Sequence, residues 1–170
     1  MTSLPHAAAV QHYESSATPG ELIAAYERGI DDLAGAVAGM TADQLRARPI
    51  AGKWSTLEVV CHVADSEQFF ADRLKRTIAM ERPLLMGADS DRYLASLNYQ
   101  HHEVQEELDL VAITRMQLAR ILRGLSAATW ERTAVHSEKG LMTLHQLLLY
   151  PVNHLNHHLA FIAAKRAAMK

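Results

Sequence analysis

The chain has 170 residues, of which 49% are apolar and 21% charged, and its formal net charge at pH 7 is −2. These values predict one soluble globular domain without the concentrated basic surface that nucleic-acid binding requires. The single cysteine, Cys61, excludes an internal disulfide and favours a reducing, cytoplasmic location, and we expect no secretion signal and no membrane span.

We expect residues 1–17 to be loosely ordered and residues 18–170 to form a single domain. The first signals of a helix start occur at the beginning of that domain. "TPGE" at 18–21 reads as a capping box with proline at the first helical position. The apolar residues from Leu22 to Met40 then recur at the spacing of one helical face. The pattern predicts a first long helix, which ends before the connection around Pro49 and Gly52.

Three further long helices follow along the chain. "STLE" at 55–58 is a second capping box and predicts a helix to about residue 80. The next helix runs from about residue 90 or 93 to 123, with a break expected near Asn98 and a stop at Gly124. "TLHQ" at 143–146 opens the last helix, after a loop with an extended piece at 133–136. The fold class is therefore all-α, a four-helix bundle with long connections.

Histidine is the unusual feature of the composition, with 10 residues. In "HLNHH", His154 and His158 are four residues apart and share one helix face, which is a spacing that seats two imidazoles on one metal ion. His157 falls on another flank, where we expect it at the rim of the site. Histidines at this spacing can also simply pack or hydrogen-bond, so the spacing by itself leaves both interpretations open.

A metal site needs a further ligand, and His62 on the second long helix is the best candidate. Ligands on the second and fourth helices can face a common interior in a bundle. Glu58 and Asp65 share the helix face of His62 and could hydrogen-bond its free ring nitrogen. Together with His157 they are the candidates for a catalytic base.

The other histidines are expected at the surface or in packing roles: His6, His12, His101, His102, His136 and His145. Cys61 adjoins His62 but points about 100° away on a helix, so we assign it to the core. No E-x-x-H or H-E-x-x-H motif occurs, which argues against a ferritin-like di-iron centre and a zincin-type protease.

With these residues in place, the chain resembles the DinB-like superfamily, including its YfiT-type members. The resemblance covers about residues 18–165 and is most specific in "GKWSTLEVVCHVADSE" at 52–67 and in the final H-x-x-x-H. It implies an antiparallel-type four-helix bundle, often a homodimer, whose metal ligands would be His62, His154 and His158.

The resemblance also implies a function. Three neutral imidazoles leave open positions on a divalent ion, which is typical of catalytic sites. We expect Zn²⁺ or Ni²⁺, with Fe²⁺ or Mn²⁺ as alternatives, in a hydrolase or an S-transferase that uses a low-molecular-weight thiol. The substrate would be a small electrophile, in detoxification or stress response. The alternative is a non-catalytic, stress-related dimeric bundle in which the metal or the histidines only stabilise the fold.

Overall fold

Four long helices form the body of the protein in the computed structural model, which describes residues 12–169. They are α1 (Pro19–Val37), α3 (Thr56–Ala79), α5 (Val104–Arg123) and α7 (Leu144–Ala168). Shorter helical segments lie in the connections: α2 (Ala42–Arg46), α4 (Ser90–Ser96), the 3-10 turn η1 (Tyr99–His101) and α6 (Ala127–Trp130). The predicted all-α four-helix bundle with long connections is confirmed.

Side-chain caps set where these helices begin. All three predicted capping boxes are present, at Thr18, Ser55 and Thr143, and each pairs with the acid or amide three residues later. A fourth box, formed by Thr41 with Gln44, starts α2 inside a segment that the sequence analysis treated as a plain connection. The "TADQ" pattern was a usable signal for that helix.

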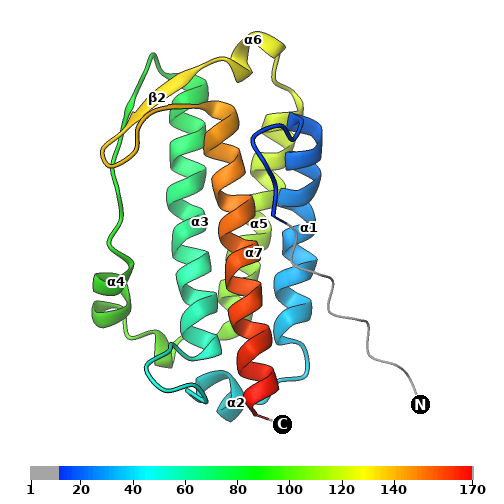
Figure 1. Cartoon of the computed structure of the whole chain (residues 1–170), viewed down its shortest axis with the longest axis vertical. Helices are drawn as coiled ribbons and strands as arrows, with labels where there is room; N and C mark the ends of the chain where they lie inside the picture. Colours follow the sequence, from blue (N-terminus) through cyan, green and yellow to red (C-terminus); the bar gives the residue numbers. More distant parts are fainter. Residues whose placement is uncertain (1–11, 170) are drawn as a thin grey trace, which may run out of the picture.

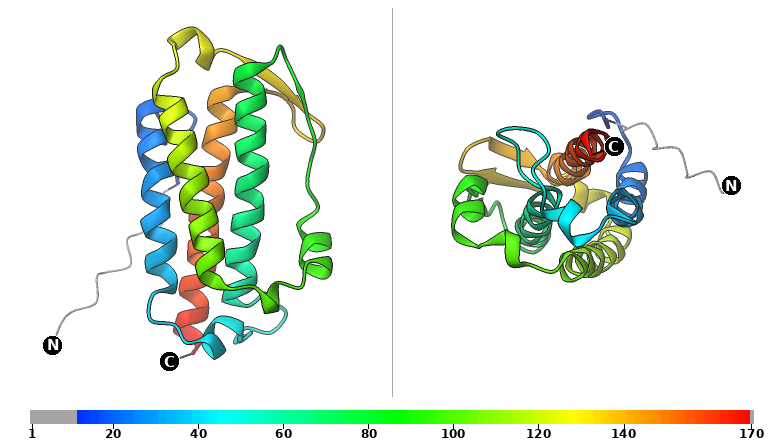
Figure 2. Two further views of the ribbon diagram at one scale, coloured as in Figure 1. Left: turned by 180° about the vertical axis from the view of Figure 1, so that it is seen from behind. Right: turned by 90° about the horizontal axis from the view of Figure 1, so that it is seen from below.

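The helices form a square in which α1 contacts α7 and α5, and α3 contacts the same two. Figure 1 shows α1 and α7 running downward and α3 and α5 upward, and Figure 2 shows the same directions from behind. Each helix therefore has one parallel and one antiparallel neighbour. This arrangement differs from a simple antiparallel bundle, because the segment from α3 to α5 returns along the outside of the bundle.

That return segment explains the break in the third predicted helix. Asn98 adopts a left-handed conformation with φ of 55°, which separates α4 from η1 and α5. At the end of the bundle where α3 ends, the return segment pairs with a hairpin (Figure 1). Together they form a three-stranded sheet of β1 (Leu84–Leu85), β2 (Thr133–His136) and β3 (Gly140–Thr143). The extended piece expected at 133–136 is thus a strand.

Residues 12–17 lie against α7. The backbone of Tyr13 exchanges hydrogen bonds of 2.9 Å and 2.8 Å with the side chain of Asn153. The expectation of loose order for 1–17 falls largely on residues 1–11, which lie outside the described residues, and it stays a prediction. Among the described helices, none has the length and apolar character needed to cross a membrane.

An ion pair lies buried between α1, α3 and α5. Arg115 and Glu67 are each 1% exposed, and the guanidinium donates two hydrogen bonds of 3.0 Å and 2.8 Å to Glu67 Oε2. The Tyr26 hydroxyl donates to the other oxygen of Glu67, while Tyr26 O accepts from Nη1 of Arg115 at 3.0 Å. Every charged atom is thereby hydrogen-bonded, which a buried ion pair requires.

The side chain of Arg115 approaches the backbone of α1 closely at Gly29. A Cβ at this position would overlap Nη1 of Arg115 and Cδ2 of Leu155. We predict that Gly29→Ala lowers the free energy of unfolding by about 1–3 kcal/mol through overpacking. Urea denaturation measures the change.

The control for that substitution is on the same helix. Gly35 is exposed and a Cβ there would meet nothing within 4 Å, so Gly35→Ala should be neutral or stabilising by up to about 1 kcal/mol. Equal stabilities of Gly29→Ala and the wild type would contradict the packing described for Arg115.

Candidate metal centre

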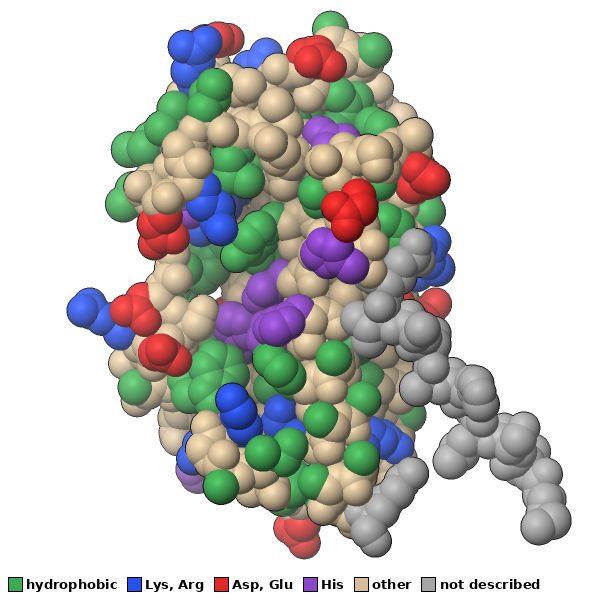
Figure 3. Space-filling view, in the orientation of Figure 1, with side chains coloured by type: hydrophobic (Ala, Val, Ile, Leu, Met, Phe, Trp, Pro, Cys, Tyr) green, Lys and Arg blue, Asp and Glu red, His purple; other side chains and the backbone are tan. Residues whose placement is uncertain are grey.

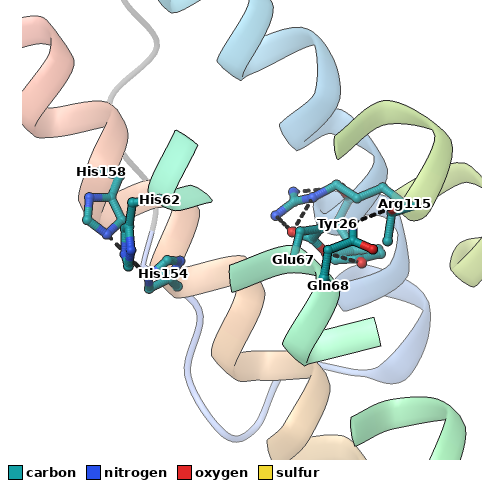
Figure 4. Close-up of polar contacts among 8 residues, drawn as sticks. Tyr26, His62, Glu67, Gln68, Arg115, His154 and His158 are labelled. Carbon is teal, nitrogen blue, oxygen red and sulfur yellow. Dashed lines mark hydrogen bonds and ion pairs between the residues drawn. The ribbon is translucent and has the colours of Figure 1, made fainter. Parts of the chain in front are cut away.

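Three imidazole rings meet between α3 and α7. Nε2 of His154 lies 3.0 Å from Nε2 of His62 and 3.2 Å from Nε2 of His158. The ring centroids are 4.5–5.0 Å apart. Figure 4 shows the three side chains projecting from two helices toward one another, at a distance from the Tyr26–Glu67–Arg115 cluster.

The helices bring these rings together in a simple way. Both α3 and α7 begin with a capping box, and they pack side by side in opposite directions (Figure 1). His62 therefore meets the pair on α7, whose spacing of four residues places both rings on one face. All three residues predicted as ligands lie together in the structure.

The spacing of the nitrogens matches a metal-binding set. Two ligand atoms at about 2.0–2.1 Å from one ion, with an angle of about 90–110°, are about 2.8–3.4 Å apart. Hydrogen bonding alone explains the cluster poorly, because Nε2 of a neutral imidazole offers either one proton or one lone pair. His154 Nε2 faces two other nitrogens, so only one of its two contacts can be a good hydrogen bond.

Burial keeps the rings neutral, and neutral imidazole is the form that binds metal. Burial, followed by the neighbouring His158 and His62, lowers the pKa of His154 to about 2. Burial and His62 likewise lower the pKa of His158 to about 3, and burial lowers that of His62. Lone pairs are therefore available at neutral pH without a competing proton.

His158 provides a further observation. Its Nδ1 is buried and has no hydrogen-bond partner among the described residues. Leaving such a group unpaired costs about 1–3 kcal/mol. Within the described part of the chain, Nε2 of the same ring has a hydrogen-bond contact only with His154 Nε2, at 3.2 Å. Coordination of an ion by Nε2 would therefore leave Nδ1 unpaired but add a favourable interaction at the other nitrogen. The three residues thus fit a divalent ion.

Aromatic side chains hold the ring of each histidine. Trp54 packs edge-on against His62 with ring centroids 5.2 Å apart, and Phe70 packs against His154 at the same distance. Tyr150, one turn before His154, stacks with its ring at 6.3 Å. These contacts restrict the rotamers of the proposed ligands and make the surroundings of the site apolar.

The carboxylate of Glu58, a predicted catalytic base, forms its hydrogen bonds with groups outside the histidine cluster. Its carboxylate accepts hydrogen bonds from Arg48 and from the backbone N–H of Ser55. Burial alone would raise the pKa of Glu58, but these bonds lower it to about 2, so the group is a weak base. Its role in the structure is to cap α3 and to pair with Arg48.

Asp65 and His157 are also directed away from the meeting point of the rings. Asp65 accepts a hydrogen bond from the Tyr99 hydroxyl, and no bond from it or from Glu58 to His62 is present. His157 is exposed, with its ring 4.5 Å from that of Phe161 and 5.5 Å from that of His158. Neither residue lines the cavity beside His62 and His154.

A cavity of about 100 Å³ opens beside His62 and His154. Figure 3 shows exposed histidines beside a hollow in this face of the molecule, with charged side chains around it. Its polar lining comes from α3, the start of α4, the hairpin and α7, and includes Ser66, Arg73, Ser90, His136, Glu138, Lys139 and Tyr150.

These polar residues were missed by the sequence analysis, which placed His136 among surface or packing histidines. His136 is 4% exposed on β2, and its Nδ1 accepts a hydrogen bond of 3.2 Å from the backbone of Glu138, so Nε2 carries the proton. Burial and the nearby Arg73 lower the pKa of His136. The only sequence signal was the predicted extended piece at 133–136, which did not reveal where the hairpin lies.

Two other predicted assignments have clear outcomes. Nε2 of His145 donates a hydrogen bond of 2.7 Å to Ala17 O, a packing role away from the cluster. Cys61 is 1% exposed, and burial raises its pKa to about 12, so its thiol belongs to the core. Cys61 lies near His102 and Glu107.

The ring nitrogens of His102 contact Glu107 at 2.8 Å and Leu97 O at 3.0 Å. These contacts account for the closeness of His102 and Glu107 as an ion pair.

Fold and site together define a helical bundle protein with a three-histidine cluster open to a cavity. The sequence profile of the DinB superfamily matches residues 25–162. This range covers most of the chain, and the chain therefore belongs to the DinB superfamily.

Curated relatives carry a consistent description. A protein of Oceanobacillus iheyensis is 29% identical over 122 residues, covering 72% of this chain and 70% of its own length. A protein of Bacillus licheniformis is 28% identical over 138 residues, covering 81% and 78%. Both are named "Putative metal-dependent hydrolase".

A solved structure is similar throughout. YfiT from Bacillus subtilis superimposes with a TM-score of 0.84 at 26% identity, covering 94% of this chain and 91% of YfiT. It is described as "a probable metal-dependent hydrolase with an unusual four-helix bundle topology". The two chains therefore share one four-helix bundle fold over nearly their whole length.

We predict that Zn²⁺ stabilises the protein through this cluster. Adding Zn²⁺ at about 100 times its dissociation constant to chelator-treated protein should contribute about 2.7 kcal/mol. For a domain of this size that raises Tm by about 5–10 °C. Thermal unfolding with and without Zn²⁺ measures the shift.

The matched variants for this measurement lie on one helix. His154→Ala should abolish the Zn²⁺-dependent shift in Tm, whereas His145→Ala should keep it, because His145 contacts Ala17 O instead of the cluster. A shift that persists in His154→Ala would show that the ion binds elsewhere.

Proposed function

We propose that this chain is a metal-dependent hydrolase of small molecules, with His62, His154 and His158 as the ligands of its divalent ion. The observation that carries the proposal is the meeting of three neutral imidazoles beside a cavity. Zn²⁺ or Ni²⁺ suits imidazole ligands best, with Fe²⁺ or Mn²⁺ as alternatives. The names of the relatives support the same class of activity.

The ion supplies Lewis-acid chemistry when bound, since it polarises a carbonyl or phosphoryl oxygen and makes water more acidic. Three protein ligands leave at least one position for water or substrate. Trp54 and Phe70 pack against the ligand rings, so they fix the ligands and limit the access of bulk water.

The polar side chains of the cavity have distinct roles in this proposal. The protonated Nε2 of His136 is a hydrogen-bond donor, and Tyr150 carries a hydroxyl beside His154. Either group can donate to an oxygen on which negative charge develops. Arg73 and Lys139 bring positive charge to the same cavity, and Glu138 offsets it only in part, so the lining favours a substrate with a negative or strongly polar end.

Thiol-dependent group transfer at the same metal centre is the alternative to hydrolysis. A low-molecular-weight thiol in place of water would make the protein an S-transferase that acts on small electrophiles, in detoxification or stress response. Cys61 cannot supply that thiol, because it is buried and its pKa is raised to about 12. A homodimer and a cytoplasmic location remain part of the proposal.

We predict metal-dependent turnover of at least one member of a panel of esters, amides and thiol-reactive electrophiles. The rate should fall at least a hundredfold in His62→Ala and after chelation, because the ligand set is broken. His136→Leu should lower kcat by about tenfold or more, because leucine has no hydrogen-bond donor in place of Nε2–H. Steady-state kinetics on Zn²⁺-loaded and Ni²⁺-loaded protein measure these effects.

The matched control is His145→Ala, which should retain the wild-type rate. Equal rates in the wild type and His62→Ala would contradict the proposal. A panel without any turnover, in protein shown to bind metal, would favour the alternative function of a non-catalytic bundle that the metal only stabilises.

A further inference from the structure

A second pocket, of about 320 Å³, lies on the other flank of the histidine cluster. It is formed by residues 50–54, the start of α3 and the C-terminal part of α7, and it shares no lining residue with the cavity beside His62 and His154. Its walls are mostly apolar, with Ile50, Trp54, Val59 and Phe161. Its size falls in the range of small-molecule sites. Figure 3 shows basic side chains among hydrophobic ones below the histidines on this face.

The charges of the pocket are of one sign. Lys53 and Lys165 line it, and no acidic residue does. The side chain of Lys165 is the unusual one, because the residue is 3% exposed. In the described part of the chain, no carboxylate oxygen lies within 4.0 Å of its ammonium group.

The contacts of Lys165 do not neutralise it. Nζ lies 3.4 Å from the carbonyl oxygen of Phe161, one turn earlier on α7, and 5.6 Å from the centroid of the Phe161 ring. Glu58 is the acid that acts on Lys165 through space, but Arg48 and the backbone of Ser55 already occupy its carboxylate. Burial and Lys53 lower the pKa of Lys165.

A buried ammonium group without a counter-ion is costly, and an anion from outside the chain would offset that cost. The apolar walls favour a ligand with a hydrophobic body over a bare inorganic ion. We propose that this pocket binds a small organic carboxylate, with its apolar body between Trp54 and Phe161 and its carboxylate at Nζ of Lys165.

This site does not depend on the proposed hydrolase activity, since none of the residues that recognise the anion is a proposed metal ligand. His158 is the one member of the cluster that lines the pocket. A ligand bound here would therefore lie beside the metal centre, but on the side away from Arg73 and Lys139.

Isothermal titration calorimetry with 4-phenylbutyrate and the uncharged 4-phenylbutanol tests the proposal. The carboxylate should bind at least tenfold more tightly than the alcohol, because it gains a charge-assisted bond to Lys165. Lys165→Met should remove that preference and leave the affinity for the alcohol unchanged. The substitution deletes a buried charge and keeps the side-chain length, so the variant should fold; its Tm confirms this.

Two controls separate this pocket from the metal centre. Lys139→Met, in the other cavity, should leave the affinity for 4-phenylbutyrate unchanged, and so should removal of metal with a chelator. The proposal is overturned if the two probes bind equally, if neither binds at millimolar concentration, or if Lys165→Met keeps the preference. Loss of binding on chelation would also overturn it, since the carboxylate would then be a ligand of the ion.

Discussion

The antiparallel contact between α3 and α7 is the constraint on which the rest of the site depends. It places His62 opposite His154 and His158, so that the Nε2 atoms of His62 and His158 lie 3.0 Å and 3.2 Å from Nε2 of His154. Such a meeting of neutral lone pairs inside a core is unfavourable unless something binds them. A chain that places these rings together and packs Trp54 and Phe70 around them has the properties of a preformed ligand set.

The bundle holds this ligand set in place through a second polar centre. Five residues after His62, Glu67 forms the buried ion pair with Arg115 that joins α3 to α5 and, through Tyr26, to α1. The pair restricts sliding of α3 against its neighbours, because any shift would leave a buried charge unpaired. Leu155, next to His154, packs close to Gly29 in the same layer. The histidine cluster and the ion pair thus lie on the same helix, α3, whose position is restricted by both its α5 and its α7 contacts.

Much of this could be predicted from local sequence, because helix periodicity and capping boxes are short-range signals. They located the four helices, placed His154 and His158 on one face and selected His62 as their partner. The Ser55–Glu58 capping box was also predicted, yet Glu58 is among the predicted candidate bases; the structure shows that its cap and its pairing with Arg48 occupy the carboxylate. What could not be predicted depends on the long connections. His136 reaches the cavity because the hairpin crosses the end of the bundle, and Asp65 meets Tyr99 because η1 lies against α3. No periodic pattern encodes those paths.

The central claim is that His62, His154 and His158 bind one divalent ion, and metal analysis of the protein purified without a polyhistidine tag tests it most directly. Inductively coupled plasma mass spectrometry should find about one equivalent of a transition metal or zinc per chain in the wild type. The His62→Ala and His154→Ala variants should each retain only a small fraction of it. Wild-type protein free of metal after growth with excess Zn²⁺ and Ni²⁺ would contradict the account. So would variants that keep the full equivalent.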